Sequence, residues 1–82
     1  MTATLENVGF YTKVRIAAAI AEFFENEIAK EYGEVWEIDF DKNFRFSATD
    51  ATVPDKLEHH GWFASADVLE VYLFANFPKL AP

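Results

Sequence analysis

The segment Val35–Ala48, VWEIDFDKNFRFSA, is the strongest indication of the fold, because apolar and polar side chains alternate along both of its halves. Successive side chains of a strand point to opposite faces, so this period of two predicts strands at 35–40 and 44–48, each with one apolar face. The apolar set is Trp36, Ile38, Phe40, Phe44, Phe46 and Ala48. Between the strands, Asp41-Lys42-Asn43 predicts the turn of an antiparallel hairpin, with Asn43 in the left-handed region.

A turn of this length also predicts the register of the hairpin. The expected cross-strand pairs are Phe40 with Phe44, Ile38 with Phe46, Trp36 with Ala48, and Asp39 with Arg45. The two apolar halves would then share one face, which needs a helix or a second sheet to cover it.

The segment from Thr12 to Tyr32 predicts the covering helix, because its apolar residues fall on about half of a 3.6-residue wheel. Thr12 is the expected N-cap, and Gly33 is the expected left-handed residue after the last turn. The hairpin is expected to pack on the apolar side chains Ile16, Ile20, Phe23, Phe24 and Ile28.

The C-terminal half is less regular. Pro54 predicts a short helix that extends through Glu58 and is ended by Gly61. Residues 66–77 fit a helix capped by Ser65, but they also alternate well enough to form a third strand. Trp62 and Phe63 are expected in the core. The sequence thus predicts one α+β domain over residues 1–82, with an N-terminal arm at 1–10 and a flexible, extended tail at 78–82.

Composition limits the class of partner. The chain has 82 residues, 14 Asp and Glu against seven Lys and Arg, a net charge of −7 and no cysteine. Such a surface repels nucleic acids and membranes and attracts basic proteins. The absence of cysteine is compatible with a reducing compartment, and residues 1–10 do not resemble a secretory signal, so we expect a cytoplasmic protein.

The chain contains a cluster of carboxylates in and around the first strand of the hairpin: Glu31, Glu34, Glu37, Asp39 and Asp41. Carboxylates two residues apart on a strand stand roughly 7 Å apart, which is close to the phosphate spacing of a nucleic-acid strand. The cluster could therefore imitate a nucleic-acid backbone. The alternative is that these charges only keep an exposed strand soluble.

Catalytic and cofactor motifs are missing from the sequence. There is no glycine-rich phosphate loop, no nucleophile elbow and no His-x-x-x-His pair, and the adjacent His59 and His60 would diverge on a helix. We therefore expect no enzyme activity, no cofactor and no metal site.

Two functions fit these observations. The first is a small acidic inhibitor that occupies the basic, nucleic-acid-binding surface of a protein or nucleoprotein complex. Phage anti-defence proteins, such as anti-CRISPR inhibitors, and toxin-immunity proteins share this size and charge balance, which is an analogy of class only. The alternative is a homo-oligomeric accessory subunit, a homodimer for example, that uses Tyr72 and Phe74 in its apolar C-terminal segment.

Overall fold

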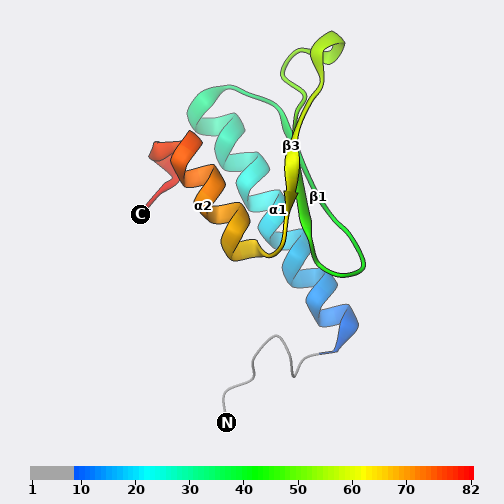
Figure 1. Ribbon diagram of the computed structural model, residues 1–82. Coiled ribbons are helices and arrows are strands. Elements are labelled where there is room, and N and C mark those ends of the chain that lie inside the picture. Colours follow the sequence, from blue (N-terminus) through cyan, green and yellow to red (C-terminus); the bar gives the residue numbers. More distant parts are fainter. Residues whose placement is uncertain (1–8) are drawn as a thin grey trace.

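The computed structural model describes residues 9–82 and shows an α+β domain (Figure 1). Helix α1 spans Phe10–Tyr32, strands β1, β2 and β3 span Trp36–Phe40, Phe46–Asp50 and Glu58–Phe63, and helix α2 spans Ala66–Asn76. Two short 3-10 turns, η2 at Pro54–Lys56 and η3 at Pro78–Leu80, complete the elements. The strands form one antiparallel sheet in the order β1-β2-β3. The predicted fold class is confirmed.

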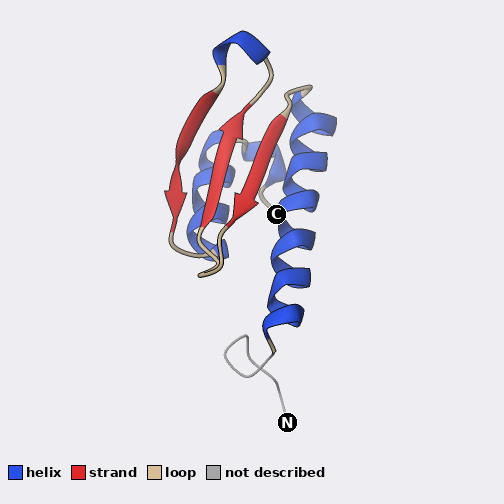
Figure 2. Ribbon diagram, turned by 90° about the vertical axis from the view of Figure 1, so that its right-hand side faces the viewer, coloured by secondary structure: helices blue, strands red, loops and turns tan. Residues whose placement is uncertain are grey.

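The sheet has a covered face and an open face. Figure 1 views the sheet from its edge and shows α2 and most of α1 on one side of it. In the view of Figure 2 the strands lie in front of α2, α1 runs beside β1, and no helix of the described residues crosses in front of the sheet. The core therefore lies on one side of the sheet, and the opposite side faces solvent.

Helix α1 begins earlier than the sequence indicates. Gly9 is the N-cap and makes no side-chain cap, whereas Thr12 lies inside the first turn, so the prediction of a Thr12 cap was wrong. The extra residues are accounted for by a tertiary contact, because the ring of Phe10 lies 5.7 Å from the ring of Phe44. At the other end Gly33, with φ 66°, donates its N–H to the Ala29 carbonyl, which confirms the predicted C-cap.

The hairpin exists, but its register lies two residues beyond the predicted one. Ile38 pairs with Ala48 rather than with Phe46, and Asp39 pairs with Ser47 rather than with Arg45. The loop is longer than expected and runs over residues 41–45, and the left-handed residue is Phe44, with φ 59°, not Asn43. Because a shift of two residues leaves every side chain on its original face, the predicted faces are still correct.

The short helix predicted to run from Pro54 to Glu58 ends early. Only Pro54–Lys56 form a 3-10 turn, and the chain then enters strand β3, which pairs with β2. Gly61 does not end a helix: it has φ 84° and lies where the pairing with β2 shifts by one residue, as in a β-bulge.

Helix α2 confirms the helical alternative for residues 66–77, and the third strand comes from residues 58–63 instead. The Ser65 hydroxyl accepts a hydrogen bond from the Val68 N–H at 3.4 Å, as predicted for an N-cap. After α2 the chain is not extended. Residues 78–80 form a 3-10 turn, Leu80 packs against the core, and the Lys79 N–H donates to the Tyr32 hydroxyl at 2.9 Å.

The core forms where α1 and α2 meet the covered face of the sheet. Ile28, Leu69 and Leu73 are fully buried in it. The other buried apolar residues are Ala17, Ala21, Phe24, Trp36, Ile38, Phe46, Ala48 and Phe77. Phe63 packs against this core, but Trp62 is 56% exposed, so its predicted place in the core was wrong. Phe23, also predicted to pack on the hairpin, is exposed as well.

Candidate functional site

The candidate site is the open face of the sheet, formed by the side chains that alternate with the core residues. It consists of Glu37, Asp39, Ser47, Thr49, His59 and Trp62. The strand register arranges them in two rows across the sheet, Glu37–Thr49–His59 and Asp39–Ser47–Trp62. In each row a carboxylate on β1 and a ring on β3 lie on either side of a small hydroxyl residue. Figure 2 shows these strands from the open face.

Trp62 is the large apolar group of the open face. Its ring lies 5.9 Å from the ring of His59 and 6.0 Å from the Arg45 guanidinium. Ser47, which pairs with Trp62, is only 4% exposed. Contacts with two neighbours hold the Trp62 ring against the sheet, while more than half of the residue stays open to solvent. A positioned but exposed Trp is the kind of side chain that anchors protein interfaces.

Glu37 and Asp39 supply the negative charge of the open face. Both are exposed, and neither forms a hydrogen bond or an ion pair through its side chain with another residue in the range 9–82. They are two residues apart on one strand, hence roughly 7 Å from each other. Their carboxylates are thus available to basic groups of a partner.

Asp41 does not belong to this face, because its carboxylate organises the loop 41–45. Oδ1 accepts from the N–H groups of Asn43 and Arg45, both at 2.9 Å, and Oδ2 accepts from Arg45 Nε at 2.8 Å. The bond from the Arg45 N–H is the principal reason why the pKa of Asp41 is lower than its ordinary value of 3.8. Asp39 and Arg45 were predicted to lie across from each other in the hairpin, but Arg45 forms its ion pair with Asp41.

The other two predicted carboxylates also lie away from the open face. Glu34 precedes β1, and its Oε1 accepts from Trp36 Nε1 at 3.0 Å. Glu31 is exposed in the last turn of α1. The structure therefore brings together two members of the predicted cluster, Glu37 and Asp39, and adds Trp62 to them.

The two predicted aromatic contact residues of α2 are half-buried. Tyr72 lies 4.8 Å from the ring of Phe63, and burial is the main reason why the pKa of Tyr72 is raised. Phe74 packs edge-on against Phe24 with their ring centroids 6.0 Å apart. The large apolar side chains that α2 does expose are Val68, at 45%, and Val71, at 70%. Their i, i+3 spacing on one helical face is visible in the sequence once the helix is known.

The two histidines occupy opposite faces of β3. His60 packs on Trp36 on the covered side, with 5.1 Å between ring centroids, and His59 is on the open face. Within residues 9–82 no group of three His, Asp or Glu side chains is arranged to hold a metal ion.

Two residues with a role in the structure, Trp62 and Glu25, were not predicted from the sequence to have one at these places. Glu25 Oε2 accepts a hydrogen bond from the Ile38 N–H at 2.7 Å. It thereby satisfies a backbone donor on the side of β1 that has no neighbouring strand. No pattern in the chain marks this role, but the alternation around the Gly61 bulge could have indicated the orientation of Trp62.

The chain matches no protein-family model, no curated protein and no solved structure. Neither helix of the described part of the chain has the length and apolar character needed to cross a membrane.

Proposed function

We propose that this domain is a cytoplasmic, non-enzymatic inhibitor that uses its open face to bind a basic surface of another protein or nucleoprotein complex. The single observation that carries the proposal is the combination on one uncovered sheet face of an exposed Trp62 with the available carboxylates of Glu37 and Asp39. Covering a nucleic-acid-binding surface would block it without direct contact between this domain and nucleic acid; the comparison with phage anti-defence or toxin-immunity proteins is an analogy of class.

The two kinds of group contribute differently to binding. A Trp ring removes roughly 150–250 Å² from water when it is fully buried, so Trp62 supplies the slowly dissociating part of the contact. Glu37 and Asp39, together with the net charge of −7, attract a basic partner and speed association. Arg45 is already paired with Asp41, and this ion pair leaves its positive charge little opportunity to oppose a basic partner.

The test is a capture experiment at low salt with three forms of the domain as bait. The first is the wild type, and the second carries Trp62→Ser, Glu37→Gln and Asp39→Asn. The third is a matched control, Glu22→Gln with Asp55→Asn, which removes the same charge from exposed positions away from the open face.

We expect one basic protein to be retained by the wild type and the control and lost by the open-face variant. With that protein purified, affinity should fall at least 10-fold in the variant, should fall as salt rises, and should be abolished by nucleic acid that occupies the same surface. Equal retention by all three baits, or an affinity unchanged between low salt and about 0.5 M, would contradict the proposal.

A second candidate function, a homo-oligomeric accessory subunit, is favoured by the exposure of Val68 and Val71 on α2. Helix α2 therefore has large apolar side chains on its exposed side as well as on its buried side, and a second copy of the chain could cover them. Light scattering at micromolar concentration should then show a dimer or larger species that Val71→Glu dissociates. A monomeric wild type would remove this candidate.

A further inference from the structure

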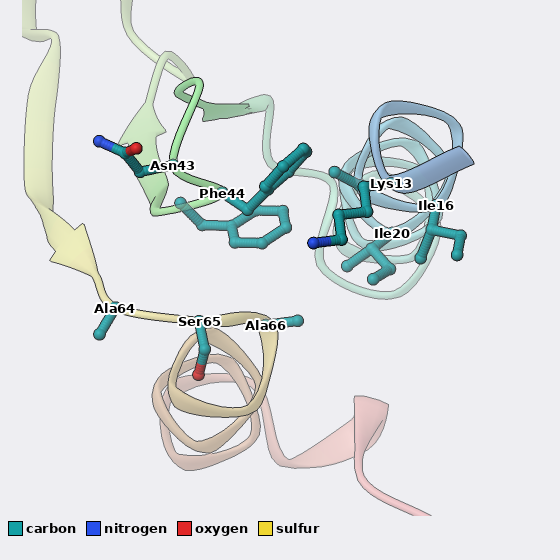
Figure 3. Close-up of a pocket in the computed structure, with 10 residues that line it drawn as sticks. Lys13, Ile16, Ile20, Asn43, Phe44, Ala64, Ser65 and Ala66 are labelled. Atoms are coloured by element: carbon teal, nitrogen blue, oxygen red, sulfur yellow. The ribbon is translucent and has the colours of Figure 1, made fainter. Parts of the chain in front are cut away.

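A cavity of about 460 Å³ lies on the covered side of the sheet, away from the open face. Figure 3 shows Lys13, Ile16 and Ile20 of α1 together with Phe44 on one side of it, and Ala64–Ala66 at the start of α2 across from them. This volume is in the range of pockets that hold small molecules. Apart from Lys13, Asn43 and Ser65, its lining is apolar.

A second hollow of about 500 Å³ lies between α1 and the segment from α2 to the C-terminal residues. Ile16 and Ile20 line both hollows, so the two lie next to each other between α1 and α2, and together they are called the channel. The far part of the channel is lined by Ala19, Phe23, Phe24, Glu70, Phe74, Leu80 and Pro82. From Lys13 to Phe24 the helix rises about 16 Å, which is near the length of a medium acyl chain. Phe23, an exposed apolar residue of α1, is among the residues that line this far part.

The charges along the channel differ between its two ends. Lys13 is the one charged residue that lines the first cavity, and its Nζ lies 6.0 Å from the centre of the Phe44 ring. Among the described residues no carboxylate lies within ion-pair distance of Lys13. Residues 9–21 of the chain contain Lys13 and Arg15 and no acidic residue, although the protein as a whole is strongly acidic. The far end of the channel carries Glu70 instead.

Phe44 adds an independent observation at the same cavity. Its φ of 59° is in the left-handed region, which a bulky residue rarely adopts. Residues with strained backbone cluster at active sites and ligand clamps. The Phe44 ring lines the cavity and lies 5.7 Å from the ring of Phe10 and 6.0 Å from Lys13 Nζ.

We propose that this channel binds an amphipathic carboxylate of the fatty-acid class. The carboxylate lies at Lys13, and the alkyl chain runs over Ile16 and Ile20 toward Phe74. The positive charge at one end and Glu70 at the other allow one orientation of the ligand. The inference does not depend on the proposed function, because the channel and the open face are on opposite sides of the sheet.

The test is calorimetric titration of the full chain with dodecanoate, below the concentration at which it forms micelles. Octanoate, hexadecanoate, dodecanol and dodecyltrimethylammonium serve as comparison ligands. Anionic and neutral lipid vesicles form a separate arm, which distinguishes a free fatty acid from a membrane surface as the source of the acyl chain.

Lys13→Gln removes the charge at the cavity, and Lys42→Gln is the matched control at an exposed position of the loop 41–45. Ala19→Phe fills the second hollow from an exposed helix position, so it tests the course of the alkyl chain without disturbing the core. Circular dichroism and thermal unfolding establish that each variant is folded.

We expect dodecanoate to bind one to one and more tightly than dodecanol, and dodecyltrimethylammonium not to bind. Lys13→Gln should weaken dodecanoate at least 5-fold and leave dodecanol unchanged, and Lys42→Gln should change neither. Ala19→Phe narrows the second hollow and should weaken the binding of dodecanoate and hexadecanoate more than that of octanoate. Absence of binding at millimolar dodecanoate, equal binding of the cationic and anionic amphiphiles, or binding to vesicles alone would overturn the proposal.

Discussion

The contact between Glu25 and strand β1 gives the sharpest prediction about stability. Ile38 is 3% exposed, and its N–H points away from β2 to Glu25 Oε2 at 2.7 Å. Glu25→Ala leaves that buried donor without a partner. A hydrogen bond to a charged group is worth about 1.5–3 kcal/mol, so we expect the free energy of unfolding to fall by about 2 kcal/mol.

That loss is large for a domain of this size. At about 0.05–0.15 kcal/mol per residue, 82 residues correspond to a total of about 4–12 kcal/mol. A loss of about 2 kcal/mol should lower Tm by about 8–16 °C. Glu25→Gln keeps a carbonyl acceptor at the same position, and we expect it to cost about 1 kcal/mol, because the acceptor is no longer charged.

The assay is urea unfolding followed by circular dichroism, with thermal unfolding as a second measurement. Glu22→Ala is the matched control, since it is an exposed position of the same helix and experiences the same change in helix propensity. If Glu25→Ala and Glu22→Ala differ by less than about 0.5 kcal/mol, the hydrogen bond is not a significant part of the fold and the argument is refuted.

Three further predictions concern the loop, the core and the bulge. Because the pKa of Asp41 is lower in the folded protein than its ordinary value of 3.8, its carboxylate stabilises the fold above that pH and loses this effect as pH falls below it. Asp41→Asn should therefore lower the urea midpoint at pH 7 and approach the wild type near pH 2; an equal deficit at both pH values would contradict this. Leu73→Ala removes a fully buried side chain and should cost about 2–5 kcal/mol in urea unfolding, whereas Val71→Ala, on the exposed face of the same helix, should cost less than about 0.5 kcal/mol. Gly61→Ala places a Cβ on a residue with φ 84° and should cost about 1–2 kcal/mol by the same assay; no loss would mean that the bulge relaxes.

The candidate site could be predicted from the sequence only in part. The outward direction of Glu37 and Asp39 followed from the alternation along β1, and the structure keeps it. The grouping of the remaining carboxylates did not follow, because their positions depend on hydrogen bonds formed after folding. Asp41 is bound to the amides of its own loop, and Glu34 to the Trp36 indole.

The register of the hairpin could not be predicted from the local sequence pattern. The period of two specifies which face each residue takes, but it is unchanged when one strand slides by two residues. The choice between Phe46 and Ala48 as the partner of Ile38 then depends on the loop. Asp41 stabilises a loop that extends to Arg45, and Phe44 takes the left-handed position that local propensity assigns to Asn43.

The sequence alone was enough to predict the α+β class, the long helix and its end at Gly33, the hairpin and its two faces, and the Ser65 cap of α2. These features depend on periodicity and capping, which act between residues close together in the chain. Only the tertiary structure decided that residues 58–63 form the third strand and that Trp62 is exposed on the open face. It also decided that Glu25 closes the edge of β1 and that α1 and α2 leave a channel between them. Each of these depends on the packing of segments distant in the chain, which a local pattern does not encode.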